Sequence, residues 1–128
     1  MGCEMFLGNC NNCKNFVRST NVIVSGTSLV IVIPQDVFSD GEKVCVCVSQ
    51  AIPFYAPTIT QVAIQIGTNA TLYNLVTEKG EFVSPSQIKA RRVYHLRAAA
   101  TSQMFRVLRR ELCGCNRTNN TIPAGETV

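Results

Sequence analysis

The chain contains no tryptophan, three tyrosines and one histidine, and charged residues make up only 16% of its 128 positions. The stacking aromatics of single-strand nucleic-acid platforms are therefore scarce. No apolar run approaches the roughly 18 residues that a membrane-spanning helix needs. The opening stretch MGCEMFLGNCNNCKN also lacks the basic start and apolar core of a secretory signal. We therefore expect a soluble chain with no membrane partner that is not exported by such a signal.

Catalytic patterns are also missing. The single histidine, His95, stands between Tyr94 and Leu96, and no acid or nucleophile close to it in sequence suggests a triad. The eight acidic residues are scattered, without the spacing of an oxygen-ligand metal loop, and there is no glycine-rich phosphate loop. We expect no enzyme activity, no catalytic residues and no cofactor.

Apolar residues, by contrast, are abundant, at 46% of the chain. A length of 128 residues suits one domain with its own core. So few charges leave a thin polar surface for a monomer of this size. We therefore expect part of the apolar surface to be buried against a partner, either in a homo-oligomer or in a larger assembly.

Short β-branched runs separated by turn residues dominate the middle of the chain. Residues 21–33 (NVIVSGTSLVIVI) predict a hairpin around Gly26, which Pro34 ends. Further strands are predicted at KVCVCVSQ, QVAIQIG and TLYNLV. The pattern indicates an all-β fold, a single β-sandwich or jelly-roll-like domain of about eight short strands with extended termini. The predicted divisions are a Cys-rich arm at 1–19, the β-domain at 20–115 and a tail at 116–128.

The stretch from residue 84 to 112 permits two interpretations. Ser84 as an N-cap, Pro85 at the first helical position and the apolar spacing near the end would suit a helix. RRVYHLRA and MFRVLRREL each suit a strand, with ATSQ as the connection. We predict two strands, with a short helical turn after Ser84 compatible with either interpretation.

The seven cysteines form three groups: one near the N-terminus, one in VCVCV and one in CGC. If the termini meet, four thiolates could hold a structural zinc ion. These candidate ligands are Cys10, Cys13, Cys113 and Cys115. The alternative, which we favour, is reduced cysteines that pack as small apolar residues. Strand alternation puts Cys45 and Cys47 on one face and the flanking valines on the other, so both faces of that strand are apolar.

Basic residues gather late in the chain. The segment from Lys89 to Arg117 contains eight lysines and arginines but a single acid, Glu111. Arginine is favoured in protein interfaces because its planar fork binds carboxylates, and a basic strand pair could also face phosphate. We predict a protein interface, so nucleic acid is not the expected partner. The candidate interface residues are Arg91, Arg92, Arg97, Arg106, Arg109 and Arg110.

The segments NVIVSGTSLVIVIP and RRVYHLRAAATSQMFRVLRREL, with the CGC ending, resemble the small β-sandwich accessory and decoration proteins of tailed bacteriophage heads. The resemblance implies a virion structural protein, made in the host cytoplasm, that binds the major capsid protein or another virion protein on the capsid surface as an oligomer. The alternative is a small zinc- or nucleic-acid-binding β-module that uses the Arg-rich strands.

Overall fold

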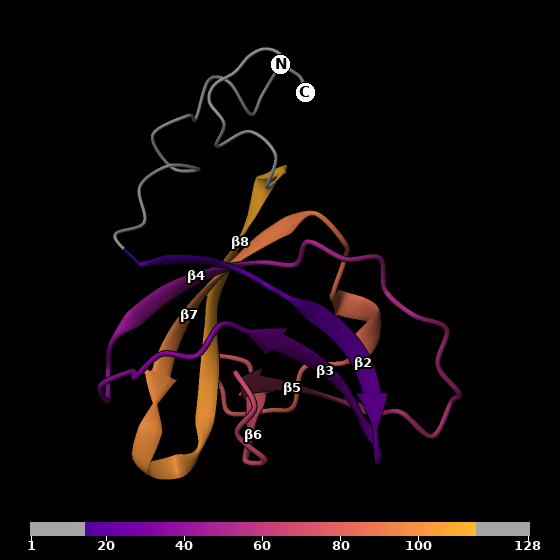
Figure 1. The fold of residues 1–128 in the computed structure, drawn as a ribbon, viewed down its shortest axis with the longest axis horizontal. Helices are drawn as coiled ribbons and strands as arrows, with labels where there is room; N and C mark the ends of the chain where they lie inside the picture. The colour runs from indigo at the N-terminus through magenta and orange to yellow at the C-terminus, as the bar shows by residue number, and fades with distance from the viewer. Residues whose placement is uncertain (1–14, 115–128) are drawn as a thin grey trace.

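The computed structural model describes residues 15–114, and eight strands within this range share one mixed sheet. The sheet has the order β1-β4-β7-β8-β6-β5-β3-β2 and curls into a half-barrel (Figure 1). The strands are β1 (Phe16–Arg18), β2 (Asn21–Ser25), β3 (Ser28–Ile33), β4 (Lys43–Cys47), β5 (Gln61–Ile66), β6 (Leu72–Val76), β7 (Arg92–Ala99) and β8 (Met104–Gly114). The all-β prediction is confirmed. The sandwich form is not confirmed, because the strands share a single sheet.

Local turn chemistry explains where most strands begin and end. The hairpin of β2 and β3 turns at Gly26, whose φ of 59° is easy only for glycine, and β3 ends immediately before Pro34. β5 and β6, both predicted as strands, pair antiparallel around Gly67. The hairpin predicted at residues 21–33 is confirmed.

The ambiguous segment after Ser84 contains two strands, as predicted. Ser84 caps only the short 3-10 helix η1 (Pro85–Gln87), while β7 and β8 pair antiparallel through the connection η2 (Ala100–Ser102). The register shifts between His95 and Leu96, which marks a bulge in this pair. Leu96 pairs with Val107 and His95 pairs with Arg109, so Leu108 is the extra residue in β8, and the alternation of faces along β8 does not extend past it.

The main core lies on the concave side of the sheet. Along the regular parts of the strands, alternate residues point inward, as the 2-residue period of a strand requires. Phe105 is at the centre, with its ring centroid 5.7 Å from that of Phe38 and 5.6 Å from that of Tyr73. The largest fully buried side chains of this core are Phe105, Leu29, Ile31, Ile33, Ile64, Leu75, Leu96, Val44, Val46, Val48 and Val62. Each such burial contributes about 1.5–3 kcal/mol.

Pairing between distant strands was not predicted. β1 pairs parallel with β4, β3 with β5 and β6 with β8. The strand β1 also went unrecognised, and it lies within the 1–19 segment that the sequence assigned to an arm.

One bent segment joins the two edges of the sheet. β1 occupies one edge and β2 the other, yet only Ser19 and Thr20 separate them (Figure 1). The Ser19 amide donates to the Cys47 carbonyl at 2.9 Å, and the Thr20 amide donates to the Val32 carbonyl at 2.7 Å. Adjacent amides therefore bond to β4 and β3, the strands next to the two opposite edges, which holds the sheet in its curl.

Ser19 is only 4% exposed, and its remaining polar groups are satisfied by β4 and the residues after it. Its Oγ accepts from the Ser49 amide at 2.8 Å and donates to Oε1 of Gln50. The Gln50 amide Nε2 donates to the Ser19 carbonyl at 2.9 Å. The junction between the two edges is therefore held by hydrogen bonds of the buried Ser19 with Ser49 and Gln50.

Replacing the buried Ser19 with alanine should lower the free energy of unfolding by about 1–3 kcal/mol, because the half-buried Ser49 amide and Gln50 side chain lose their hydrogen-bond partner. Thr20→Ala is the matched control, since the exposed Thr20 hydroxyl makes one bond, of 3.3 Å, to the Val32 carbonyl. That control should change stability by no more than about 0.5 kcal/mol. Urea denaturation measures both values, and equal effects would contradict the role of Ser19.

Candidate functional site

The convex side of β4, β7 and β8 carries both a group of cationic side chains and a pair of cysteines. We call it the outer face. Alternation along β4 sends Val44, Val46 and Val48 into the main core. The intervening residues Lys43, Cys45 and Cys47 lie opposite Arg97, His95 and Val93 of β7. The prediction for VCVCV is therefore confirmed: its valines lie on one apolar face and its cysteines on the other.

A lateral row of cations crosses the outer face. Arg97 lies directly opposite Lys43 of β4 on one side and Arg106 of β8 on the other. We call Lys43, Arg97 and Arg106 the basic row. The Cβ atoms of directly opposite residues are about 4.5–5.5 Å apart, and like charges in that position destabilise a sheet. An anionic partner would remove this penalty.

The basic row is accessible from solvent. Lys43 and Arg97 are exposed, and Arg106 is half-buried. Nη1 of Arg106 donates to the Glu78 carbonyl at 2.6 Å, which fixes one end of the row. The arrangement can therefore bind a carboxylate-bearing or phosphate-bearing surface through the fork of Arg97.

A second apolar cluster lies on the same face, beside the row. Cys45, Cys47 and Val93 are buried there, with Phe16 packed against them, and we call these residues the sulfur cluster. Cys45 Sγ lies 3.2 Å from Nδ1 of His95. Cys47 Sγ accepts from Nη1 of Arg18 at 3.7 Å. Polar groups therefore reach both sulfurs although the cluster itself is apolar.

Cys45 and Cys47 are both disulfide-bonded. Neither cysteine whose side chain is described is a free thiol, so the expectation of reduced cysteines is wrong for this pair. The error has a simple cause. Disulfide bonding depends on which thiols the fold brings together, and spacing along the sequence does not show this.

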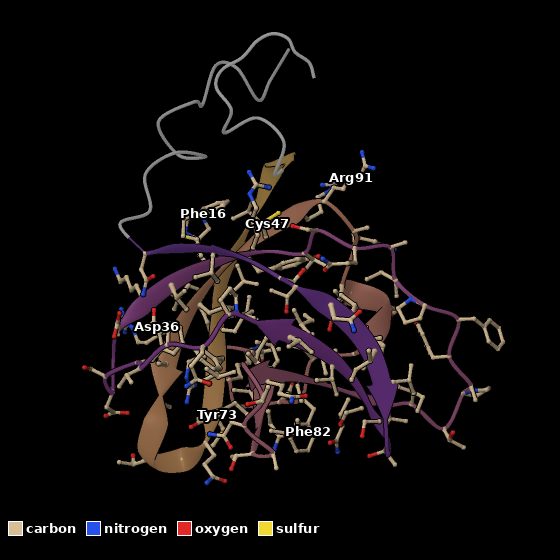
Figure 2. The ribbon with its side chains drawn as sticks, viewed as in Figure 1. Phe16, Asp36, Cys47, Tyr73, Phe82 and Arg91 are labelled. Atoms are coloured by element: carbon tan, nitrogen blue, oxygen red, sulfur yellow. The ribbon has the colours of Figure 1, made fainter. Side chains whose placement is uncertain are left out.

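Among the predicted interface arginines whose side chains are described, Arg91 and Arg92 lie apart from Arg97. Arg91 is exposed just before β7 (Figure 2), Arg92 is exposed at its first position, and Arg97 lies near its end. At about 3.3 Å per residue, Arg92 and Arg97 are roughly 17 Å apart. Arg109 and Arg110 occupy positions in β8 opposite His95 and Tyr94, and their side chains lie outside the described part.

The predicted zinc ligands fall almost entirely outside the described residues. Cys10, Cys13 and Cys115 lie beyond them, and Cys113 is placed only as a backbone position of β8. Among the side chains that the structure describes, no group of three or more His, Cys, Asp or Glu residues is arranged to hold a metal ion. Zinc binding by the terminal cysteines remains a prediction.

Lys43 is the member of the basic row that the sequence analysis missed. Nothing in its neighbourhood marks it, because its relation to Arg97 depends on the register of β4 against β7. The position of Lys43 opposite Arg97 could have been predicted only by aligning the two predicted strands by their apolar alternation.

Comparison with protein-family models, with curated proteins and with solved structures finds no match. In the described range, no helix has the length and apolar character needed to cross a membrane.

We predict that peptide mapping without reductant will find Cys45 and Cys47 in disulfide-linked peptides. Reduction should lower the free energy of unfolding by about 2–4 kcal/mol for each bond lost, because a cross-link restricts the unfolded chain. Urea denaturation with and without reductant measures the difference. Complete alkylation of both cysteines in the denatured, unreduced protein would contradict the assignment.

Proposed function

We propose that this chain is a non-enzymatic structural protein of a virion, a capsid decoration or head accessory protein that binds the major capsid protein or another virion protein. The observation that carries the proposal is the basic row, in which Arg97 lies directly opposite Lys43 on one side and Arg106 on the other, on a solvent-accessible face of the sheet. Selection for stability alone would avoid this arrangement, because like charges opposite each other are unfavourable. An acidic partner surface accounts for it.

The sulfur cluster supports the same setting. Disulfides persist at the surfaces of virions and of secreted proteins, and they are rare in proteins that stay in the cytosol. Disulfide-bonded Cys45 and Cys47 therefore suit a protein that is made in the cytoplasm and functions on a particle outside the cell. The resemblance of the strand segments to phage head accessory proteins agrees with this location.

Nucleic acid is the second candidate for the basic row, because phosphate would satisfy the same cations. Three neighbouring cations are few, however, compared with the roughly six to ten phosphate contacts of a strongly salt-dependent DNA-binding protein. The remaining described arginine pair, Arg91 and Arg92, lies at the other end of β7. A protein carboxylate partner therefore fits the geometry better.

Arg97→Glu should affect stability and binding in opposite directions. It replaces the central like charge by an opposite one, so the free energy of unfolding should rise by about 0.2–1 kcal/mol for each cross-strand pair. Binding to poly-L-glutamate, used as an acidic probe, should weaken. Lys89→Glu is the matched control, since it makes the same charge change at an exposed position away from the row. Loss of stability in Arg97→Glu would contradict the proposal.

The virion setting has its own test. Purified particles from a culture that produces the protein should contain it at a fixed ratio to the major capsid protein, and particles carrying Arg97→Glu should contain less. Quantitative mass spectrometry measures both ratios. A protein found only in the soluble fraction, or one that binds arbitrary DNA with a steep dependence on salt, would overturn the proposal in favour of the alternative.

A further inference from the structure

β8 has an open edge along much of its length. It pairs with β7 from Met104 to Gly114, but it pairs with β6 only through Met104, Phe105 and Arg106. From residue 107 onward, no segment of the described range pairs with this second side. The backbone N–H and C=O groups of such an edge can accept an added strand.

A cleft of about 420 Å³ lies against this edge. Its apolar floor consists of Val107 of β8, Tyr94 of β7, and Val83 and Ile88 from the segment between β6 and β7. The Tyr94 hydroxyl accepts from the Lys89 amide at 2.7 Å and donates to the Gln87 carbonyl at 3.3 Å. The polar tip of this tyrosine is therefore satisfied, and the floor is preformed.

The rim of the cleft carries an excess of negative charge. Glu78 and Glu81 contribute two carboxylates against the single ammonium of Lys79. The rim is also held in place: the Thr77 amide donates to the Glu81 carbonyl at 2.7 Å, and Arg106 donates to the Glu78 carbonyl at 2.6 Å. A fixed acidic rim around an apolar floor favours a ligand that is basic beside an apolar group.

We propose that this edge and cleft bind an extended peptide segment of a partner protein. The segment adds a strand to β8 beyond Arg106 and inserts an apolar side chain onto the floor formed by Val83, Ile88, Tyr94 and Val107. Strand addition supplies affinity through main-chain hydrogen bonds and specificity through alternate side chains. Residues two positions apart point to the same face, so a basic residue two positions from the apolar one reaches Glu78 or Glu81.

This surface meets the basic row only at Arg106, whose guanidinium donates to the Glu78 carbonyl. Tyr94 and Val107 belong to the concave side of the sheet, whereas Arg97 points to the outer face. The inference therefore goes beyond the proposed function, and each can fail without the other.

The test uses the full chain and a fluorescein-labelled peptide, Thr-Lys-Thr-Ile-Thr-Lys-Thr, with binding followed by fluorescence anisotropy. We expect saturable binding with a Kd below about 1 mM. Glu78→Lys and Glu81→Lys should each weaken binding by about two- to fivefold, as expected for exposed ion pairs. Asp36→Lys is the matched control, because Asp36 is exposed and lines a different cavity, of about 220 Å³. It should leave the affinity unchanged.

N-methylation of the probe distinguishes strand addition from simple occupation of the cleft. Alternate amides of an added strand face β8, so N-methylation of the isoleucine and of the residue after it should have unequal effects, with one abolishing binding. Amide NMR shifts should concentrate at residues 77–88 and 107–114. Absence of saturable binding, equal tolerance of both N-methylated probes, or weakening by Arg97→Glu in place of Glu78→Lys would overturn the proposal.

Discussion

The fold depends on the two adjacent amides of Ser19 and Thr20, which bond to β4 and β3, the strands next to the two edges of the sheet. A curled sheet of eight strands would otherwise present two free edges, each able to pair with another chain. Here β1 and β2 are consecutive halves of one bent segment, and they cover β4 and β3 respectively. The buried Ser19 hydroxyl makes the bend specific, since a residue without that hydrogen-bonding capacity would leave the Ser49 amide unsatisfied.

The closure at Ser19 also determines what the outer face can do. By holding β1 against β4, it places Phe16 over the sulfur cluster and Arg18 within reach of Cys47. The register of β4 against β7 then places Lys43 beside Arg97. The apolar sulfur cluster and the charged row are thus consecutive parts of one face. The disulfide-bonded sulfur cluster lies next to the basic row. A surface that is cross-linked in this way is suited to binding, because little conformational entropy is lost on association.

Sequence reasoning succeeded where the signal is local. Gly26, Pro34 and the alternation within SLVIVI determine the β2–β3 hairpin through the conformational limits of a few neighbouring residues. Ser84 and Pro85 indicated a helical start correctly but could not show that only one turn would follow. The β-branched and apolar alternation of β7 and β8 decided that question in favour of strands.

The candidate site was harder to predict, because its geometry comes from register between distant strands. Arg97 and Arg106 were identified by composition, but their relation to Lys43 requires β4 and β7 to pair in one specific alignment. The bulge at Leu108 of β8 has no marker such as glycine in RVLRR, so the sequence does not show where the alternation of faces is interrupted. β8 continues past its three pairs with β6, and this mismatch in strand length creates the open edge beside Val107. Local propensity cannot reveal such a feature, since an edge is a property of two strands and not of one.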